Sequence, residues 1–89
     1  MTQPSVLVVE DEAPQREVLV YNLEAEGFDV RQATSGDAAL ELAREDNPDL
    51  ILLDWMLPEV TGIEVCRRLK STAETRGIPV IMISARSEE

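Results

Sequence analysis

The sequence predicts an α/β protein in which helices cover a parallel sheet. The first observation is three short apolar runs, over residues 6–9, 50–53 and 79–83, which are unbroken as in strands buried on both faces. The second is that segments of helical periodicity separate these runs, with glycine or proline breaks between them. Because strands alternate with helices along the chain, the sheet is expected to be parallel.

The expected order of elements is β-α-β-α-β-α-β. Residues 28–31 alternate between apolar and polar side chains, as a half-exposed edge strand does. The first helix is expected over residues 14–26, with Pro14 in its first turn and Gly27 just after its end. Its predicted apolar face consists of Val18, Leu19, Tyr21, Asn22 and Leu23.

Two more helices follow from the same kind of pattern. Thr61 and Glu64 have the spacing of a capping box, which predicts the start of the third helix. The second helix is expected over residues 36–46, and residues 86–89 are expected to begin a fourth. The predicted inward residues of the second and third helices are Ala39, Leu42, Ala43, Val65, Cys66 and Leu69.

The composition excludes several classes of function. With 18 acidic and 8 basic residues the net charge is -10, which disfavours binding to nucleic acid or to an anionic membrane and suits a cation or a basic partner. A single cysteine cannot form an internal disulfide, so a reducing compartment fits. Neither a secretory signal nor a membrane-length apolar run is present in the sequence. We therefore expect a cytoplasmic protein with no membrane contact.

Acidic residues follow two of the predicted strands. The first strand ends in Glu10 and Asp11, and the third ends in Asp54. If the sheet order is 2-1-3-4, these strands are neighbours and the three carboxylates meet at one edge. Like charges about 4 Å apart repel by about 4 kcal/mol at a protein-like dielectric, so the cluster needs a proton or a cation. Mg²⁺ suits a site with few carboxylates and a phosphate oxygen.

A simpler interpretation is that acidic residues after a strand cap the next helix. Asp11 could do so ahead of Pro14. Asp54 does not fit this interpretation, because the segment 55–58 that follows it does not begin a helix. An unpaired carboxylate at the end of a buried strand also costs free energy. The two acidic positions together therefore favour a functional site.

Three groups of residues, taken together, resemble the receiver domains of two-component response regulators. They are residues 8–12, residues 49–58 with Thr61 and Gly62, and residues 78–86, and they follow the family's order at compatible spacing over the whole chain. The motif Asp-Trp-Met-Leu-Pro at 54–58 is most similar to phosphate-regulon regulators of the OmpR/PhoB family. The resemblance implies a flavodoxin-like, three-layer α/β/α fold with strand order 2-1-3-4-5.

The resemblance also implies a role for each candidate site residue. Asp54 would be the nucleophile that accepts a phosphoryl group from a sensor histidine kinase. Asp11 would bind Mg²⁺ directly and Glu10 through water, with the backbone carbonyl of Met56 as a further ligand. Ser84, just after the fourth strand, would supply the hydroxyl that binds the phosphoryl group and moves inward on activation.

The resemblance further implies a phosphoacceptor switch and not an enzyme, with only self-catalysed phosphotransfer and autodephosphorylation. The resemblance implies a DNA-binding output domain in the full-length protein, while this acidic chain itself is not expected to bind DNA. One alternative is a receiver-like interaction module without phosphoryl turnover. Another is a nucleotide- or flavin-binding protein. It is disfavoured because residues 10–12 are acidic where a phosphate cradle needs glycines.

Members of this family carry a lysine at the end of a fifth strand and then a final helix. This chain ends at Glu89, so residues 1–89 are expected to form an incomplete receiver domain that lacks the region after the fourth strand. Lys70, the only lysine, is expected on the surface of the third helix. The apolar run 80–83 would then have an open edge. For that reason we expect the chain to dimerise, exchange elements or aggregate.

Overall fold

The computed structural model of the chain describes residues 3–83. Over these residues the elements alternate as the sequence predicts. In chain order they are β1 (Ser5–Val9), α1 (Ala13–Ala25), β2 (Asp29–Ala33), α2 (Gly36–Asp46), β3 (Leu50–Asp54), α3 (Gly62–Lys70) and β4 (Val80–Ile83). The predicted fourth helix at 86–89 lies outside the described residues.

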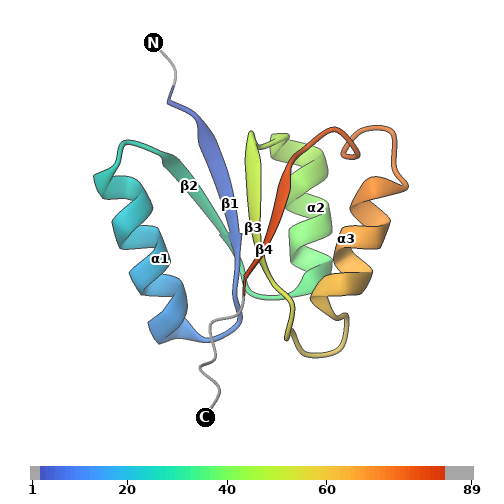
Figure 1. Ribbon diagram of the computed structural model, residues 1–89, viewed down its shortest axis with the longest axis horizontal. Helices are drawn as coiled ribbons and strands as arrows, with labels where there is room; N and C mark the ends of the chain where they lie inside the picture. Colours follow the sequence, from blue (N-terminus) through green and yellow to red (C-terminus); the bar gives the residue numbers. More distant parts are fainter. Residues whose placement is uncertain (1–2, 84–89) are drawn as a thin grey trace.

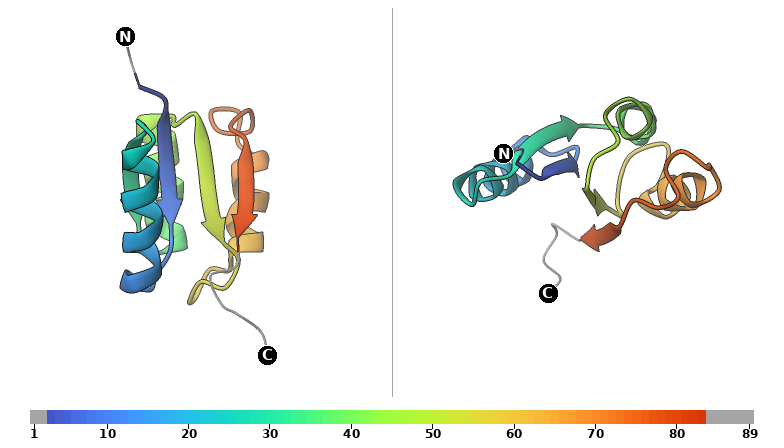
Figure 2. Two further views of the ribbon diagram at one scale, coloured as in Figure 1. Left: turned by 60° about the vertical axis from the view of Figure 1, so that its left-hand side comes forward. Right: turned by 90° about the horizontal axis from the view of Figure 1, so that it is seen from above.

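The four strands of the described region form one parallel sheet in the order β2-β1-β3-β4 (Figure 1). Helix α1 covers one face of the sheet, and α2 and α3 lie side by side on the other (Figure 2). The predicted α/β class, the strand order and the three-layer, flavodoxin-like arrangement are confirmed. Because β1 and β3 are central neighbours, their carboxyl ends meet in the middle of one sheet edge.

The core lies mainly between the sheet and the pair α2 and α3. Successive residues of a strand point to opposite faces, and Leu7 and Val9 of β1 join this core. Val6 and Val8 point to the face that α1 covers and are equally buried. The other buried members of the main core are Ala33, Ala39, Ala43, Ile51, Leu53, Leu57, Val65, Leu69 and Ile78.

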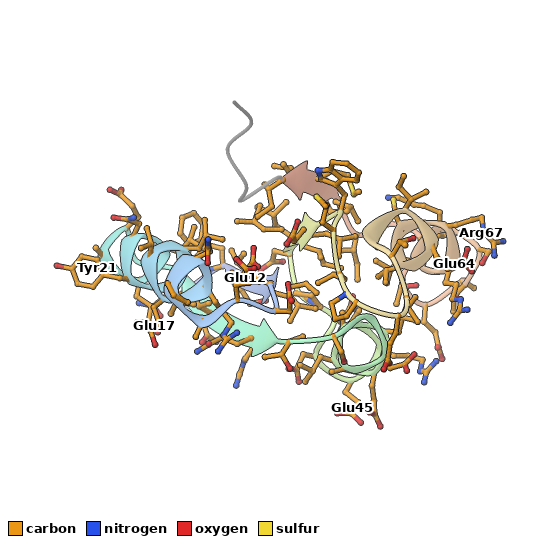
Figure 3. The ribbon with its side chains drawn as sticks, turned by 90° about the horizontal axis from the view of Figure 1, so that it is seen from below. Glu12, Glu17, Tyr21, Glu45, Glu64 and Arg67 are labelled. Atoms are coloured by element: carbon orange, nitrogen blue, oxygen red, sulfur yellow. The ribbon has the colours of Figure 1, made fainter. Side chains whose placement is uncertain are left out.

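Side-chain caps fix where α2 and α3 begin. The Ser35 hydroxyl accepts a hydrogen bond from the backbone N–H of Ala38, and the Thr61 hydroxyl accepts one from Glu64 at 3.2 Å. Only this half of the predicted capping box is formed. The Glu64 carboxylate instead pairs with Arg67 on its own helix (Figure 3) and also with Arg68. The predicted start of α3 is nevertheless confirmed.

The predicted apolar face of α1 is wrong in part. Leu19 and Leu23 are half-buried, but Val18 is 60% exposed and Tyr21 is 73% exposed and points away from the sheet (Figure 3). Asn22 is also exposed and donates a hydrogen bond to the Val18 carbonyl. Apolar side chains lie around most of this helix, so periodicity alone does not select the buried face.

Within residues 3–83, none of the helices has the length and apolar character that crossing a bilayer requires.

The loop between α3 and β4 is fastened by polar side chains of the helix and the loop. Lys70 occupies an exposed position, as predicted, and its Nζ donates to the backbone carbonyl of Ile78 at 3.0 Å. The buried Thr75 hydroxyl donates to the carbonyl of Leu69 at 2.7 Å. These bonds set the position from which β4 enters the sheet.

Strand β4 leaves apolar side chains exposed. Ile81 is 50% exposed and Met82 is 39% exposed, while Val80 and Ile83 are half-buried. Within residues 3–83, β4 pairs only with β3. Its other edge is therefore open in this part of the chain, as expected from the apolar run.

Gly62 allows α3 to begin against the end of β3. A Cβ at this position would meet the carbonyl oxygen of Asp54 at 2.5 Å and would overlap the Cα of Trp55. The Gly62 N–H also donates to the Trp55 carbonyl at 3.2 Å. This close backbone contact holds the segment after Asp54 against the start of α3.

We expect Gly62→Ala to lower the free energy of unfolding by about 2 kcal/mol or more, because rigid backbone must move to admit the methyl group. Gly77→Ala is the matched control. A Cβ at Gly77 has no neighbour within 4 Å, so its effect should stay within about 1 kcal/mol. Urea unfolding of both variants measures the difference. Equal stability of the two variants would contradict the close contact.

Self-association through β4, whose outer edge is unpaired within residues 3–83, stays a prediction. Light scattering after size exclusion should detect species larger than a monomer, and Ile81→Lys should reduce them because a charge on an edge strand opposes pairing. Amide exchange at Met82 should slow as the protein concentration rises. A monodisperse monomer with protected β4 amides would contradict the prediction.

Candidate functional site

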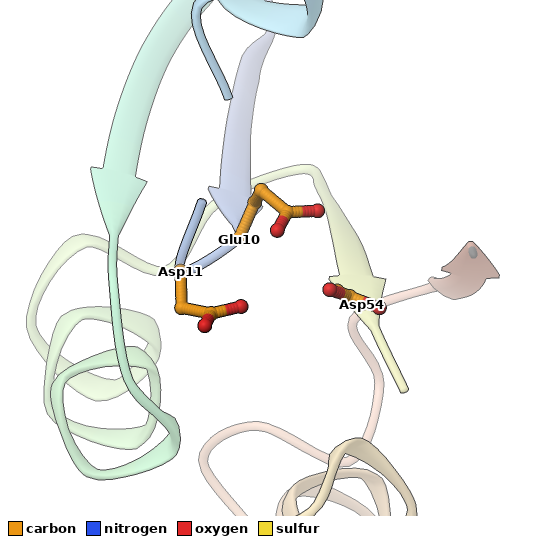
Figure 4. Close-up of side chains that lie close together, drawn as sticks. All are labelled: Glu10, Asp11 and Asp54. Atoms are coloured by element: carbon orange, nitrogen blue, oxygen red, sulfur yellow. The ribbon is translucent and has the colours of Figure 1, made fainter. Parts of the chain in front are cut away.

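Three carboxylates meet at the carboxyl ends of β1 and β3. Glu10 and Asp11 follow β1 directly, and Asp54 is the last residue of β3. One carboxylate oxygen from each lies within 4.8 Å of the others (Figure 4). The convergence predicted from the strand order is therefore confirmed.

Backbone N–H groups hold one oxygen of two of these carboxylates. The N–H of Glu12 donates to Oε2 of Glu10 at 3.0 Å, and the N–H of Met56 donates to Oδ1 of Asp54 at 3.0 Å. Three other oxygens, Oε1 of Glu10, Oδ1 of Asp11 and Oδ2 of Asp54, are buried and have no hydrogen-bond partner among residues 3–83. Buried oxygens left in this way are the expected ligand set for a cation.

The electrostatics of the cluster also favour a bound cation. Glu10 and Asp54 are fully buried, and Asp11 is half-buried. Burial raises the pKa of Glu10, the hydrogen bond from the Glu12 N–H opposes that rise, and the negative charges of Asp54 and Asp11 add to it. A divalent cation would relieve both the burial cost and the repulsion, so the residues present fit a Mg²⁺ site.

The interpretation of Asp11 as a helix cap is not supported. The N-cap position of α1 is Glu12, with Pro14 in the first turn as predicted. Asp11 therefore lies before the helix, with its carboxylate in the cluster (Figure 4).

A groove of about 490 Å³ borders the carboxylates on the side of the loop after β3. Two of its side chains, Trp55 and Met56, are 44% and 40% exposed. It is lined by Asp11, Trp55, Met56, Leu57, Pro58, Thr61 and Ile63. Trp55 thus lies beside the site, where its fluorescence can report on changes at Asp54.

The predicted roles of Met56 and Ser84 in the site stay predictions. The Met56 N–H contacts Asp54, while the role of the Met56 carbonyl as a metal ligand stays a prediction. Ser84 lies outside the described residues. Sequence analysis did not single out Arg16 of α1, whose guanidinium donates to the Glu10 carbonyl at 3.0 Å. No spacing or motif signals a contact of this kind, because its acceptor is a backbone atom.

The family model and the relatives that match this chain agree with one another. Residues 6–89 match the response regulator receiver domain family. The chain is 54% identical over 86 residues to the phosphate regulon transcriptional regulatory protein PhoB of Rhizobium meliloti (strain 1021), covering 97% of the chain and 38% of that protein. For the PhoB protein of Escherichia coli (strain K12) the identity is 51% over 84 residues, covering 94% and 37%. The chain thus spans well under half of these relatives.

Solved structures show the same similarity. The N-terminal domain of a response regulator receiver protein from Methanoculleus marisnigri JR1 has a TM-score of 0.91 and 36% identity, covering 99% of this chain and 72% of that one. The receiver domain of the sensor histidine kinase PA1611 from Pseudomonas aeruginosa PAO1 has a TM-score of 0.90 and 27% identity, covering 96% and 70%. That structure is described with a magnesium ion coordinated in its active site cleft.

The raised pKa of Glu10 predicts how its replacement affects stability. A carboxyl whose pKa is higher in the folded chain contributes stability at low pH that is lost as the pH rises through its ionisation. In metal-free buffer at neutral pH, Glu10→Gln should therefore raise the free energy of unfolding by on the order of 1 kcal/mol. The amide oxygen can still accept the Glu12 N–H. The gain should shrink toward pH 4.

Urea unfolding at both pH values measures this difference. Glu17→Gln is the control, because Glu17 is exposed on α1 (Figure 3) and should change stability little at either pH. A Glu10→Gln chain that is less stable than the unmutated chain at neutral pH would show that the cluster is not under electrostatic stress.

Proposed function

This chain belongs to the response regulator receiver domain family, and from that premise we propose that it is a phosphoacceptor switch with Asp54 as the nucleophile. The observation that carries the proposal is the state of the Asp54 carboxylate. Its Oδ1 is held by the Met56 N–H, while its buried Oδ2 has no partner among residues 3–83. One oxygen is thus oriented and the other is available for chemistry.

In the proposed reaction Oδ2 of Asp54 attacks the phosphorus of a phosphohistidine on a sensor kinase. A P–O bond forms and the P–N bond breaks, and its electron pair leaves on the imidazole nitrogen. The products are an aspartyl phosphate on this chain and an unphosphorylated histidine on the kinase. The reaction leaves this chain as the modified product, so we assign it a signalling role and not that of an enzyme acting on a separate substrate.

Mg²⁺ is the proposed cofactor. Glu10, Asp11 and Asp54 would hold it, together with the backbone carbonyl of Met56. When bound, it supplies positive charge against the carboxylates and the incoming phosphoryl oxygens. Support comes from the buried carboxylate oxygens that have no hydrogen-bond partner in the described region and from the magnesium ion described in the PA1611 receiver domain.

Ser84 is proposed to bind the phosphoryl group through its hydroxyl and to move on activation. It follows β4 directly in the sequence, and β4 is the neighbour of β3 in the sheet. In the register of these strands Ile83 pairs with Asp54. Ile83, the last residue of β4, is therefore at the sheet edge where the carboxylates converge, and this supports the proposal.

The proposed setting is a cytoplasmic two-component pathway with a sensor histidine kinase as donor and a DNA-binding output domain. Support comes from the relatives, which are named as transcriptional regulatory proteins and extend well beyond this chain. The net charge of -10 makes this chain unsuited to contact DNA itself. The alternative, an interaction module without phosphoryl turnover, would not explain why three carboxylates meet at this sheet edge with two of them buried.

In the full-length protein, incubation with Mg²⁺ and acetyl phosphate, or with a histidine kinase, should add one hydroxylamine-sensitive phosphoryl group, detected as a mass increase. Asp54→Asn should abolish the label because it removes the nucleophilic oxygen. Asp37→Asn is the matched control, since Asp37 is exposed on α2 and should keep full labelling. Ser84→Ala should keep most of the label.

Labelling of the Asp54→Asn protein at the unmutated stoichiometry would assign the nucleophile to another residue. A response of Trp55 fluorescence to Mg²⁺ in a protein that never accepts a phosphoryl group from any donor would favour the interaction module instead.

A further inference from the structure

The side chain of Arg16 connects α1 to the end of β1 and to β2. We propose that Arg16 is a positioning residue that holds Glu10 in its metal-binding orientation, an inference that rests on the proposed Mg²⁺ site. Its Nη1 donates to the backbone carbonyl of Glu10 at 3.0 Å, and its Nε donates to Oε1 of Gln32 at 3.2 Å. One guanidinium thus connects α1 with the end of β1 and with β2.

Glu10 is fixed at each of its polar groups except one. Its backbone N–H donates to the carbonyl of Ala33 on β2 at 3.1 Å, and its Oε2 accepts the N–H of Glu12. Arg16 holds the remaining backbone group, the carbonyl. Only Oε1 lacks a hydrogen-bond partner within the described residues. Fixing the peptide in this way determines where Oε1 lies relative to Asp54.

The partners of Arg16 indicate that its role is geometric. Arg31, Arg67 and Arg68 form the ion pairs found between side chains of residues 3–83, each with a carboxylate. Arg16 instead donates to a peptide carbonyl and to a neutral amide, although the chain carries a net charge of -10. A planar guanidinium with several donors is suited to joining two acceptors in a fixed geometry.

Charge and geometry predict opposite effects of removing this side chain. A positive charge near the carboxylates opposes the binding of a cation, so loss of the charge alone should tighten Mg²⁺ binding. Loss of positioning should weaken binding, because outer-shell partners that orient metal ligands strongly affect affinity. The direction of the change therefore separates the two effects.

The experiment is a Mg²⁺ titration of the chain, followed by the fluorescence of Trp55, its single tryptophan. Arg16→Met removes both hydrogen bonds and keeps an unbranched side chain, and it should raise the dissociation constant about tenfold. Arg16→Lys can donate to one acceptor and should recover part of the affinity. Arg31→Met is the control, because it removes the same charge from β2 at a residue paired with Asp29 and Asp46.

Gln32→Met tests the second contact without touching α1. Gln32 is exposed, so the variant should fold, and the loss of one acceptor should weaken Mg²⁺ binding about twofold. If Arg16→Met fails to fold, this variant decides the inference alone. Urea unfolding in metal-free buffer shows which variants are folded at the titration temperature. A purely structural role of Arg16 would lower the free energy of unfolding without changing the affinity for Mg²⁺.

Unchanged or tighter Mg²⁺ binding by a folded Arg16→Met chain would overturn the inference and leave the proposed function intact. Unchanged binding by Gln32→Met, where Arg16→Met does not fold, would do the same. A folded, unmutated chain that gives no response to Mg²⁺ would overturn the proposed metal site and this inference together.

Discussion

Three carboxylates held within 4.8 Å of one another, two of them fully buried, form the constraint on which the rest of this structure depends. Such a cluster opposes folding unless a proton or a cation neutralises it. The parallel sheet creates the problem, because it makes β1 and β3 neighbours and brings their carboxyl ends together. The same arrangement provides the solution, since oxygens brought together in this way can share one cation.

The surrounding backbone decides which oxygens remain available. The N–H groups of Glu12 and Met56 each take one carboxylate oxygen, so the other oxygen of Glu10 and of Asp54 is left for a ligand. Gly62 brings the start of α3 against the end of β3 and so fixes the peptide that follows Asp54. On the other side, the half-buried Arg16 contacts the peptide of Glu10. The site thus depends on contacts from both faces of the sheet.

Much of this could be predicted from the sequence, because the signals were local and strong. Unbroken apolar runs identified β1, β3 and β4, and the acidic residues after β1 and β3 identified the site. The buried face of α1 could not be predicted, since Val18 is an aliphatic residue like Leu19 and Tyr21 has a large aromatic ring, yet both are exposed. Strand β2 was predicted over 28–31 but covers Asp29–Ala33, because pairing with β1 and not its own pattern sets its bounds. Arg16 was missed because its acceptor is a backbone carbonyl.

The central claim is that the three carboxylates form one cation-binding site that limits the stability of the chain without metal. Urea unfolding at a series of Mg²⁺ concentrations tests it most directly. At a concentration about ten times the dissociation constant, Mg²⁺ should raise the free energy of unfolding by about 1.4 kcal/mol, and Asp11→Asn should remove most of that increase. An unfolding midpoint that does not change with Mg²⁺, or an equal increase in the Asp11→Asn chain, would contradict the claim.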